Sequence, residues 1–455
     1  MILTEYEKLF SALPAGVSDA DAHYEMRNEL CAVYSGGSIT DASSRHKQAI
    51  YVRATTGGTG IAYTERADMP ALDMLKRAME SAGLGDKDER DVFPKGDESD
   101  YDESRMEFIK PKISELKQRT LRIAQAMHAY DEYINYIDLR RIDQYDEIVN
   151  SNGVKSNRYA GYYSLELQFM CNEGTMNGEK TMAFIFNDLQ EPDFANIAAN
   201  MTGSVKLLSD AQEVESNTCD IILSSTAASK FLFCLSLALN AQRKKNSGSC
   251  FGGKEGEKIG AECISVFDGP SHALCPAVFN VDNEGCGVRK TALIKDGVFR
   301  SFLHNSSTAG ADGTATTGNA GRRAELTGAI QARLMVTPKV MYIEPGCCDE
   351  SKLLADLGNG IYIEDILDNM HGFDYPSGDF ATPVTAIVVK NGKKVKGVTS
   401  ALWMSNILSV LADVEAVGSE MLFEGLNETF EHSFVLGAAP ILVRRQMISG
   451  TSKNN

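Results

Sequence analysis

The spacing of apolar residues predicts two long helices in the first half of the chain. Leu72, Leu75 and Met79 recur with the helical period, which predicts a helix over residues 68–82 with these three side chains buried. A second helix is predicted over residues 111–130, because this segment also has one apolar face. That face carries Ile113, Leu116, Ile123 and Met127.

Later in the same half the apolar period becomes that of a strand. Leu165, Leu167 and Phe169 alternate with polar residues, as they do in a strand with one buried face. A short helix is predicted near residues 194–201, followed by a polar stretch over residues 209–217. We interpret this polar stretch as the connection between two domains.

The second half opens with a predicted strand over residues 219–223 and then a helix that continues to about Lys244. Nearly every side of this helix is apolar, so we expect it to be buried. The remaining pattern is mostly that of strands, with two-residue turns at Asp296-Gly297 and Asn391-Gly392.

These elements predict an α+β fold of two domains, residues 1–210 and residues 211–455. The first domain would be a mixed sheet with two long helices. The second would be β-rich and would surround the buried apolar helix.

Composition is typical of a soluble protein in a reducing compartment. The chain has 43% hydrophobic and 24% charged residues, an ordinary balance for a globular protein. Its longest apolar stretch, residues 231–239, is too short to cross a bilayer, and its acidic start lacks the basic segment of a signal peptide. The ten cysteines form no Cys-x-x-Cys pair, which favours free thiols. We therefore expect a cytoplasmic protein with no membrane partner.

The net charge of −17 argues against direct binding to nucleic acids, which relies on basic side chains that neutralise phosphates. The densest basic cluster is residues 243–245. Nine acidic residues lie within residues 86–103, which predicts a solvated connection; a metal-binding acidic loop is the weaker alternative.

The histidine pattern gives no support for a metal site on a helix. The chain has seven histidines, and no two of them lie within five positions of each other, whereas helical zinc ligands are one turn apart. Two carboxylates, Glu284 and Asp379, are candidates for a paired acid–base site, but we favour their interpretation as solvated turn residues.

Five short motifs follow one another along the chain. They are residues 50–68, 282–285 (Asp-Asn-Glu-Gly), 296–298 (Asp-Gly-Val), 317–322 (Thr-Gly-Asn-Ala-Gly-Arg) and 377–380 (Ser-Gly-Asp-Phe). Each motif alone is weak. Their collinear order resembles the TldD/PmbA family of bacterial and archaeal proteins, whose members are often labelled modulators of DNA gyrase.

The resemblance also identifies what is missing. In TldD-type members the counterpart of the buried apolar helix carries His-Glu-x-x-x-His, which holds a metal and supplies a general base. Here these positions fall on or next to Leu232, Phe233 and Leu237. A later cysteine ligand has no counterpart either, because the last cysteine is Cys348. The pattern is that of the PmbA branch, also called TldE, and implies no metal and no catalytic residue in this chain.

The resemblance implies a function in a complex. The chain would be a non-catalytic subunit of a cytosolic metalloprotease, with zinc held by a TldD-type partner, and the complex would process unfolded peptides of the antitoxin or microcin-precursor type. One alternative is a stand-alone peptidase or a homodimer with an unrecognised metal site. Another is a binding protein that modulates DNA gyrase or an antitoxin without proteolysis.

Four polar residues within the motifs are the candidates for functional contacts. They are Glu284, Asn319, Arg322 and Asp379. We expect them to fix turns, to form subunit contacts or to line a substrate channel, and not to perform catalysis. We also expect an obligate dimer, either with a TldD-type partner or with a second copy of this chain.

Overall fold

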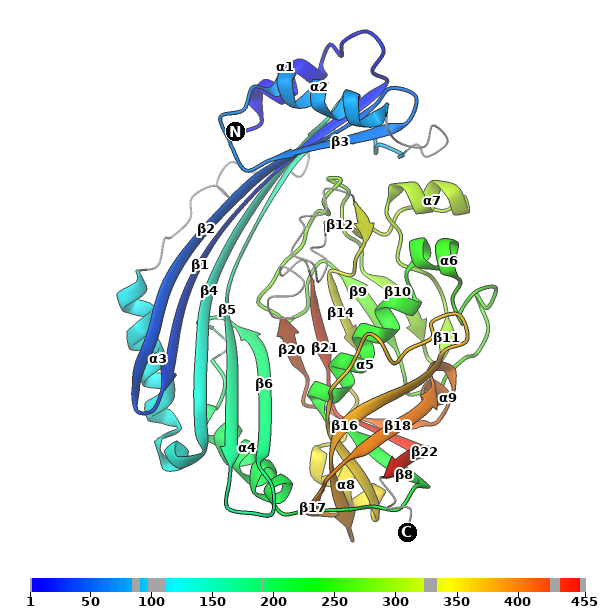
Figure 1. The fold of residues 1–455 in the computed structure, drawn as a ribbon. Coiled ribbons are helices and arrows are strands. Elements are labelled where there is room, and N and C mark those ends of the chain that lie inside the picture. Colours follow the sequence, from blue (N-terminus) through cyan, green and yellow to red (C-terminus); the bar gives the residue numbers. More distant parts are fainter. Residues whose placement is uncertain are drawn as a thin grey trace.

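The computed structural model describes residues 2–83, 91–96, 112–189, 191–322, 334–425 and 434–450. In Figure 1 a long curved sheet from the first half of the chain wraps around one side of a strand-rich second half. Helices and strands are both present and strands dominate, so the predicted α+β class is confirmed.

The curved sheet has the strand order β3-β2-β1-β4-β5-β6, and all its pairings are antiparallel. The predicted mixed sheet is therefore wrong, because short turns join most neighbouring strands and force them to run in opposite directions. The strands are β1 (Asp19–Ser35), β2 (Ser38–Thr55), β3 (Thr59–Thr64), β4 (Ile134–Asn150), β5 (Lys155–Cys171) and β6 (Gly178–Phe186).

Helices cover the two ends of this sheet (Figure 1). At one end lie α1 (Thr4–Phe10) and α2 (Ala71–Ala82), and at the other lie α3 (Ile113–Ala126) and α4 (Phe194–Ser209). Each end has its own cluster of buried apolar side chains, which the long strands connect.

The buried face of α2 differs from the prediction. Leu72 is 45% exposed and Met79 is only partly buried, while Met74, Leu75 and Ala78 form the buried stripe. The backbone of α2 at Ala78 lies directly against β3. A small side chain on that face allows this close approach, and the helix is rotated accordingly.

The other helices of the first half also have different limits from those predicted. The α3 helix ends at Ala126, and a 3-10 helix, η2 (His128–Tyr133), follows it, while α4 extends eight residues beyond the expected end at Met201. The predicted apolar faces are confirmed for the most part. Leu116, Ile123, Met127, Leu165, Leu167 and Phe169 are buried, and Ile113 is partly buried.

The second half contains a six-stranded sheet and an eight-stranded sheet. The six-stranded sheet has the order β11-β10-β9-β14-β21-β20. In the larger sheet β15 pairs with both β8 and β16, so the path β15-β8-β22-β18-β16 closes into a ring. The two-stranded sheet is β12 (Ala320–Gly321) with β13 (Met335–Val336).

The strands of the six-stranded sheet are β9 (Val266–Gly269), β10 (Thr291–Lys295), β11 (Val298–Phe299), β14 (Val340–Ile343), β20 (Leu422–Gly425) and β21 (Val435–Ala438). The strands of the eight-stranded sheet are β7 (Ala211–Gln212), β8 (Asn217–Leu223), β15 (Gly360–Ile366), β16 (Asp379–Lys390), β17 (Lys393–Val398), β18 (Ala401–Asn406), β19 (Val414–Val417) and β22 (Ile441–Gly450).

The apolar helix α5 (Ser225–Ala238) is buried on all sides between these sheets, as predicted. It does not continue to Lys244. Asn240 has an extended backbone and caps a second helix, α6 (Ala241–Ser247), by accepting a hydrogen bond from the amide of Arg243 at 3.0 Å. The further helices are α7 (Ser306–Asp312), α8 (Glu350–Leu357) and α9 (Ile407–Ala412).

Both predicted two-residue turns are confirmed. Asp296-Gly297 joins β10 to β11, and Asn391-Gly392 joins β16 to β17. The φ angles are 51° and 73° in the first turn and 49° and 73° in the second. Both central residues are thus left-handed, as the tight turn of a hairpin requires.

Two further predictions concern a membrane and the acidic connection. Within the described part of the chain, no helix has the length and apolar character needed to span a bilayer. The predicted solvated connection over residues 86–103 lies outside the described residues except for residues 91–96.

We predict that Leu237→Ala in α5 lowers the free energy of unfolding by about 2–5 kcal/mol, because Leu237 is 6% exposed in a close-packed core. Leu72→Ala on the exposed face of α2 is the matched control and should change it by about 0.5 kcal/mol or less. Chemical denaturation of both variants measures the difference. Equal effects would contradict the assigned burial of α5.

Candidate functional site

The α5 helix occupies the position at which the resemblance implies a metal site. Its cap, Ser224, accepts a hydrogen bond from the amide of Ala227 at 3.0 Å and donates one to the carbonyl of Glu364 at 2.7 Å. Side chains at the three expected ligand positions contribute carbon atoms only. They are Leu232, Phe233 and Leu237, and all three are buried. No side chain at these positions binds a metal or transfers a proton.

Asp282 holds two of the sequence motifs together. Its Oδ1 accepts hydrogen bonds from the amides of Glu284 and Cys286, both at 2.9 Å. Its Oδ2 accepts a hydrogen bond from the amide of Ala320, also at 2.9 Å. One buried carboxylate therefore fixes the turn of residues 282–286 and fastens it to the segment that contains Asn319 and Arg322.

Asn319 is fully buried and connects this segment to β9 and to the residue that follows β13. Its Nδ2 donates to Asp268 Oδ2 at 2.8 Å and to the carbonyl of Thr337 at 2.9 Å. The ammonium of Lys339 donates to the carbonyl of Ala320 at 2.7 Å. These contacts fix the backbone around Asn319 within the chain.

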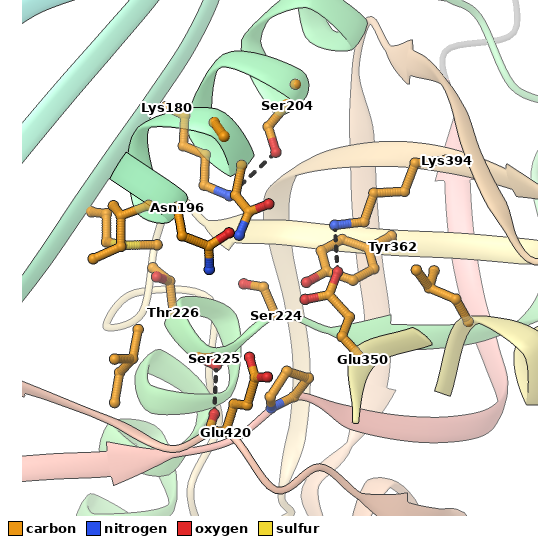
Figure 2. A pocket seen from close by; sticks show the side chains of 18 of the residues that line it. Lys180, Asn196, Ser204, Ser224, Ser225, Thr226, Glu350, Tyr362, Lys394 and Glu420 are labelled. Atoms are coloured by element: carbon orange, nitrogen blue, oxygen red, sulfur yellow. Dashed lines mark hydrogen bonds and ion pairs between the residues drawn. The ribbon is translucent and has the colours of Figure 1, made fainter. Parts of the chain in front are cut away.

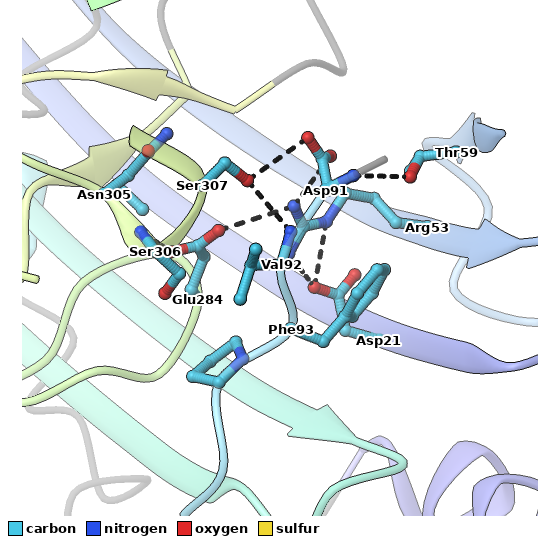
Figure 3. Close-up of polar contacts among 12 residues, drawn as sticks. Asp21, Arg53, Thr59, Asp91, Val92, Phe93, Glu284, Asn305, Ser306 and Ser307 are labelled. Atoms are coloured by element: carbon cyan, nitrogen blue, oxygen red, sulfur yellow. Dashed lines mark hydrogen bonds and ion pairs between the residues drawn. The ribbon is translucent and has the colours of Figure 1, made fainter. Parts of the chain in front are cut away.

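Glu284 is also buried, and it pairs with an arginine of the curved sheet (Figure 3). Arg53 of β2 contacts three carboxylates: Asp21 of β1 at 2.9 Å, Asp91 at 3.0 Å and Glu284 at 3.5 Å. Its guanidinium also lies 4.6 Å from the ring centroid of Phe93. The predicted solvated turn is therefore wrong for Glu284, because the folded chain places this turn against the end of the sheet.

Arg322 contacts the same end of the sheet through His23 of β1. Arg322 Nε donates to His23 Nδ1 at 3.2 Å, so Nδ1 is the acceptor and the ring proton lies on Nε2. That Nε2 donates to Asp146 Oδ1 at 2.8 Å, and Asp146 also accepts from Arg158 Nε at 2.7 Å. The Arg322 guanidinium lies over Tyr51, 4.4 Å from the ring centroid.

Burial is the first cause of the pKa shifts in this polar junction. It raises the pKa of Glu284 to about 7, opposed by Arg53, and the pKa of Asp268 to about 6, opposed by Asn319. It lowers the pKa of Lys339 to about 8 and that of Arg322 to about 10. Burial also lowers the pKa of His23, against the opposing effect of Asp146, so the neutral ring is favoured.

Two clusters in the described residues have the ligand types of a metal site, but their donor atoms are already engaged. In the first cluster, His23, Glu25 and Asp146 lie beside the cations Arg322 and Arg158. A divalent cation would be repelled by both guanidinium groups.

The second cluster consists of Asp282, Glu284 and Cys286. Asp282 already accepts three amide hydrogen bonds, and Glu284 is paired with Arg53. Burial raises the pKa of the Cys286 thiol, which disfavours the thiolate that a metal requires. Neither cluster fits a resident zinc ion.

Asp379 belongs to a separate part of the surface. It is exposed at the start of β16 and accepts a hydrogen bond from Nδ2 of Asn406 at 2.8 Å. Asp379 is thus exposed to solvent at the first position of a strand, whereas Glu284 has its own buried partners. The structure therefore provides no contact between the two carboxylates that were candidates for a pair.

A cavity of about 730 Å³ lies where α4 and β6 meet the start of α5 (Figure 2). Beside it, Lys180 pairs with the buried carboxylate of Glu364, and Lys394 lies 2.8 Å from Glu350. Burial alone would raise the pKa of Glu364, but the two lysines outweigh it and hold the pKa at about 2. Both cations are therefore neutralised within the protein, and we assign no ligand to this cavity.

Comparison with known proteins identifies the family. Residues 216–450 match the model of the PmbA/TldA metallopeptidase C-terminal domain. The chain belongs to the PmbA/TldD family. This assignment confirms the resemblance inferred from the five motifs.

Curated relatives in the family match about half of the chain. A metalloprotease of Methanocaldococcus jannaschii is 27% identical over 241 residues, which are 52% of this chain and 51% of that protein. A metalloprotease of Methanothermobacter thermautotrophicus is 25% identical over 271 residues, 58% of each chain. A TldD homologue of Haemophilus influenzae is 25% identical over 183 residues, 40% of this chain and 36% of that protein. The chain thus spans about half the length of the curated relatives it matches.

Solved structures of the family extend the similarity of fold to the whole chain. TldE from Thermococcus kodakarensis has a TM-score of 0.83 at 19% identity, and a Thermotoga maritima protein described as a candidate modulator of a DNA gyrase has a TM-score of 0.81 at 19% identity. Each comparison covers 99% of this chain and 100% of the other. At this level of identity they establish the fold alone.

The sequence did not single out Arg53, His23 or Lys339. Arg53 lies inside the motif of residues 50–68, in a strand that contained no obvious signal for chemistry. Arg53 could have been identified as a charged residue among apolar neighbours in a predicted strand, because a buried charge requires a partner of opposite charge. The four predicted candidates do not form one site, because Asp379 is separate from the other three. Their roles at a subunit interface or in a substrate channel stay predictions.

We predict that the free energy of unfolding of the wild type falls, relative to that of the Glu284→Gln variant, as pH rises from 5 to 8. The folded-state pKa of about 7 lies above the ordinary value of 4.5. Between pH 4.5 and pH 7 Glu284 is protonated in the folded chain and ionised in the unfolded chain. Stability therefore decreases as pH rises through this range, and the contribution that is fully present below pH 4.5 is lost as pH approaches 7. The loss should be on the order of 1–3 kcal/mol.

Urea unfolding at each pH measures this difference, and Asp379→Asn controls for the removal of one charge. A stability difference that stays constant or increases with pH would show that the ionised pair with Arg53 dominates.

Proposed function

We propose that this chain is the TldE-like, non-catalytic subunit of a cytosolic metalloprotease. The zinc site would belong to a TldD-type partner subunit. The observation that carries this proposal is α5, a helix buried on all sides whose expected ligand positions hold Leu232, Phe233 and Leu237. The fold similarity to TldE along 99% of the chain supports the same assignment.

The substrate in this proposal is an unfolded peptide of the antitoxin or microcin-precursor type. An extended peptide can add to the edge of a sheet through backbone hydrogen bonds. In the six-stranded sheet, β20 is the terminal strand and pairs with β21 on one side. It packs against α5 and also lies beside β6 of the curved sheet. In this proposal, a peptide strand bound along β20 would lie close to α5.

Two domains, residues 1–210 and residues 211–455, remain our proposed organisation. The family match begins at residue 216, and α4 ends at Ser209, just before the proposed boundary. Separate apolar clusters at the two ends of the curved sheet also support an N-terminal unit.

The proposed complex is a dimer, either with a TldD-type protein or with a second copy of this chain. Glu284, Asn319 and Arg322 already make buried contacts within the chain, so their contribution to a subunit contact would be indirect. Asp379 is exposed and is the candidate for a direct contact.

We predict that the purified chain retains much less than one zinc per chain after dialysis and does not cleave unfolded peptides with zinc added. The physical reason is the absence of a ligand atom at the three expected positions on α5. Elemental analysis and a fluorogenic peptide assay measure the two properties. A zinc content of about one per chain, as expected for a dedicated site, together with cleavage by the chain alone would establish the stand-alone alternative.

We also predict that a TldD-type protein from the same genome increases the mass of this chain in light scattering and that only the mixture cleaves the peptide. Replacement of the Glu in the partner's His-Glu-x-x-x-His motif is the control and should abolish cleavage without affecting assembly. A 49.5 kDa monomer with no gain of mass would contradict the subunit proposal. It would favour a binding protein that acts on gyrase or an antitoxin without proteolysis.

A further inference from the structure

A second cavity lies at the junction of the curved sheet and the second half of the chain. Its volume is about 630 Å³, which is within the range of sites for small molecules. One wall is formed by residues 92–96 of the short segment 91–96. The others are the loop of residues 285–289, the helix α7 and the segment of residues 314–316.

The wall formed by residues 92–96 is held in place from both sides. The amide of Val92 donates to Ser307 Oγ at 3.0 Å, and Asn150 Nδ2 donates to the carbonyl of Pro94 at 2.8 Å. Phe93 is buried against the Arg53 guanidinium (Figure 3). Because these contacts are made within the chain, the wall does not require a ligand to keep its position.

The charge of this cavity is opposite to that of the protein. Two cations, Lys95 and Arg289, line it, and no carboxylate occurs among its described lining residues, although the chain has a net charge of −17. Within the described part of the chain, neither cation has an ion-pair partner. The nearby carboxylates Asp91 and Glu284 are both paired with Arg53. The uncompensated positive charge therefore favours an anionic ligand.

An unsatisfied hydroxyl provides a second, independent observation. Ser156 of β5 lines the cavity and is 2% exposed, and its Oγ has no hydrogen-bond partner in the described structure. A buried hydroxyl without a partner is unfavourable and uncommon. A small rearrangement of its rotamer would let it donate to an oxygen atom of a ligand.

The remaining lining is mixed: the hydroxyls of Ser306, Thr314 and Thr316 and the thiol of Cys286 lie beside carbon surface and open backbone. Val92, Pro94, Val154 and Ala309 contribute carbon surface, and Gly285 and Gly287 leave the backbone open. Inorganic anions would leave this apolar surface without a contact. The lining instead matches a molecule that carries a carboxylate on an apolar body.

We infer that this cavity binds a carboxylate group attached to a small apolar body, with Arg289 as its ion-pair partner. A peptide that ends in an apolar residue and a free aromatic acid both have this chemistry. The inference goes beyond the proposed subunit function, because it requires neither a TldD-type partner nor hydrolysis of a peptide. Its failure and that of the subunit proposal are therefore distinguishable.

The experiment is calorimetric titration of the full chain with the peptide Ala-Ala-Phe, with the same peptide as its C-terminal amide, and with N-acetylphenylalanine. The free-acid peptide should bind at least about tenfold more tightly than the amide, since the ion pair with Arg289 is lost in the amide. N-acetylphenylalanine binding as tightly as the peptide would assign the site to free acids. Weaker binding would assign it to peptide ends.

Three variants locate the contact. Arg289→Gln should weaken the free-acid peptide about tenfold and leave the amide unchanged, and Lys95→Gln should have a smaller effect in the same direction. Arg300→Gln, at another exposed arginine of the same half, is the matched control and should change neither. Circular dichroism checks that each variant is folded. Equal binding of acid and amide, equal affinity of Arg289→Gln and wild type, or no saturable binding at millimolar peptide would overturn the inference.

Discussion

The arrangement of the two halves depends on the compensation of one buried cation, Arg53. Transferring a guanidinium from water into a protein interior is costly unless carboxylates surround it. Here the carboxylates come from β1, from the segment of residues 91–96 and from the loop that contains Glu284. These three segments are distant in sequence, so all three carboxylates reach Arg53 only when the chain is folded. The need to pair this buried cation thus favours the observed arrangement of the sheet against the second half.

The α5 helix stabilises the second half of the chain by packing. A helix that carries metal ligands needs polar side chains and access for a substrate, whereas α5 is buried along nearly its whole length and Lys230 is among its few partly exposed residues. Phe233, for example, stacks against Phe434 with their ring centroids 6.3 Å apart. In this position the helix contributes to the core of the second half and provides support for the neighbouring strands.

The sequence predicts those features that depend on neighbouring residues. The burial of α5 follows from its own apolar composition, and the two hairpin turns follow from Asp-Gly and Asn-Gly. The end of α5 was not predictable in this way, because Asn240 is also fixed by a hydrogen bond to Val336, 96 positions away. Glu284 and Asp379 occupy similar local turns, and only the partner of Glu284 in β2, 231 positions away, makes one buried and the other exposed. Candidate site residues therefore could be identified from motifs, but their environments could not.

The long pairing of β1 has a mechanical consequence. This strand is hydrogen-bonded to β2 and β4 along nearly all of its 17 residues, roughly 55 Å of chain at the usual rise per residue. Such a three-stranded ribbon resists stretching and sliding, because either motion would break many backbone hydrogen bonds together. A force applied near α3, at one end, is thus transmitted to the end that contains His23 and Arg53. The curved sheet therefore couples the end near α3 mechanically to the end that contacts the second half of the chain.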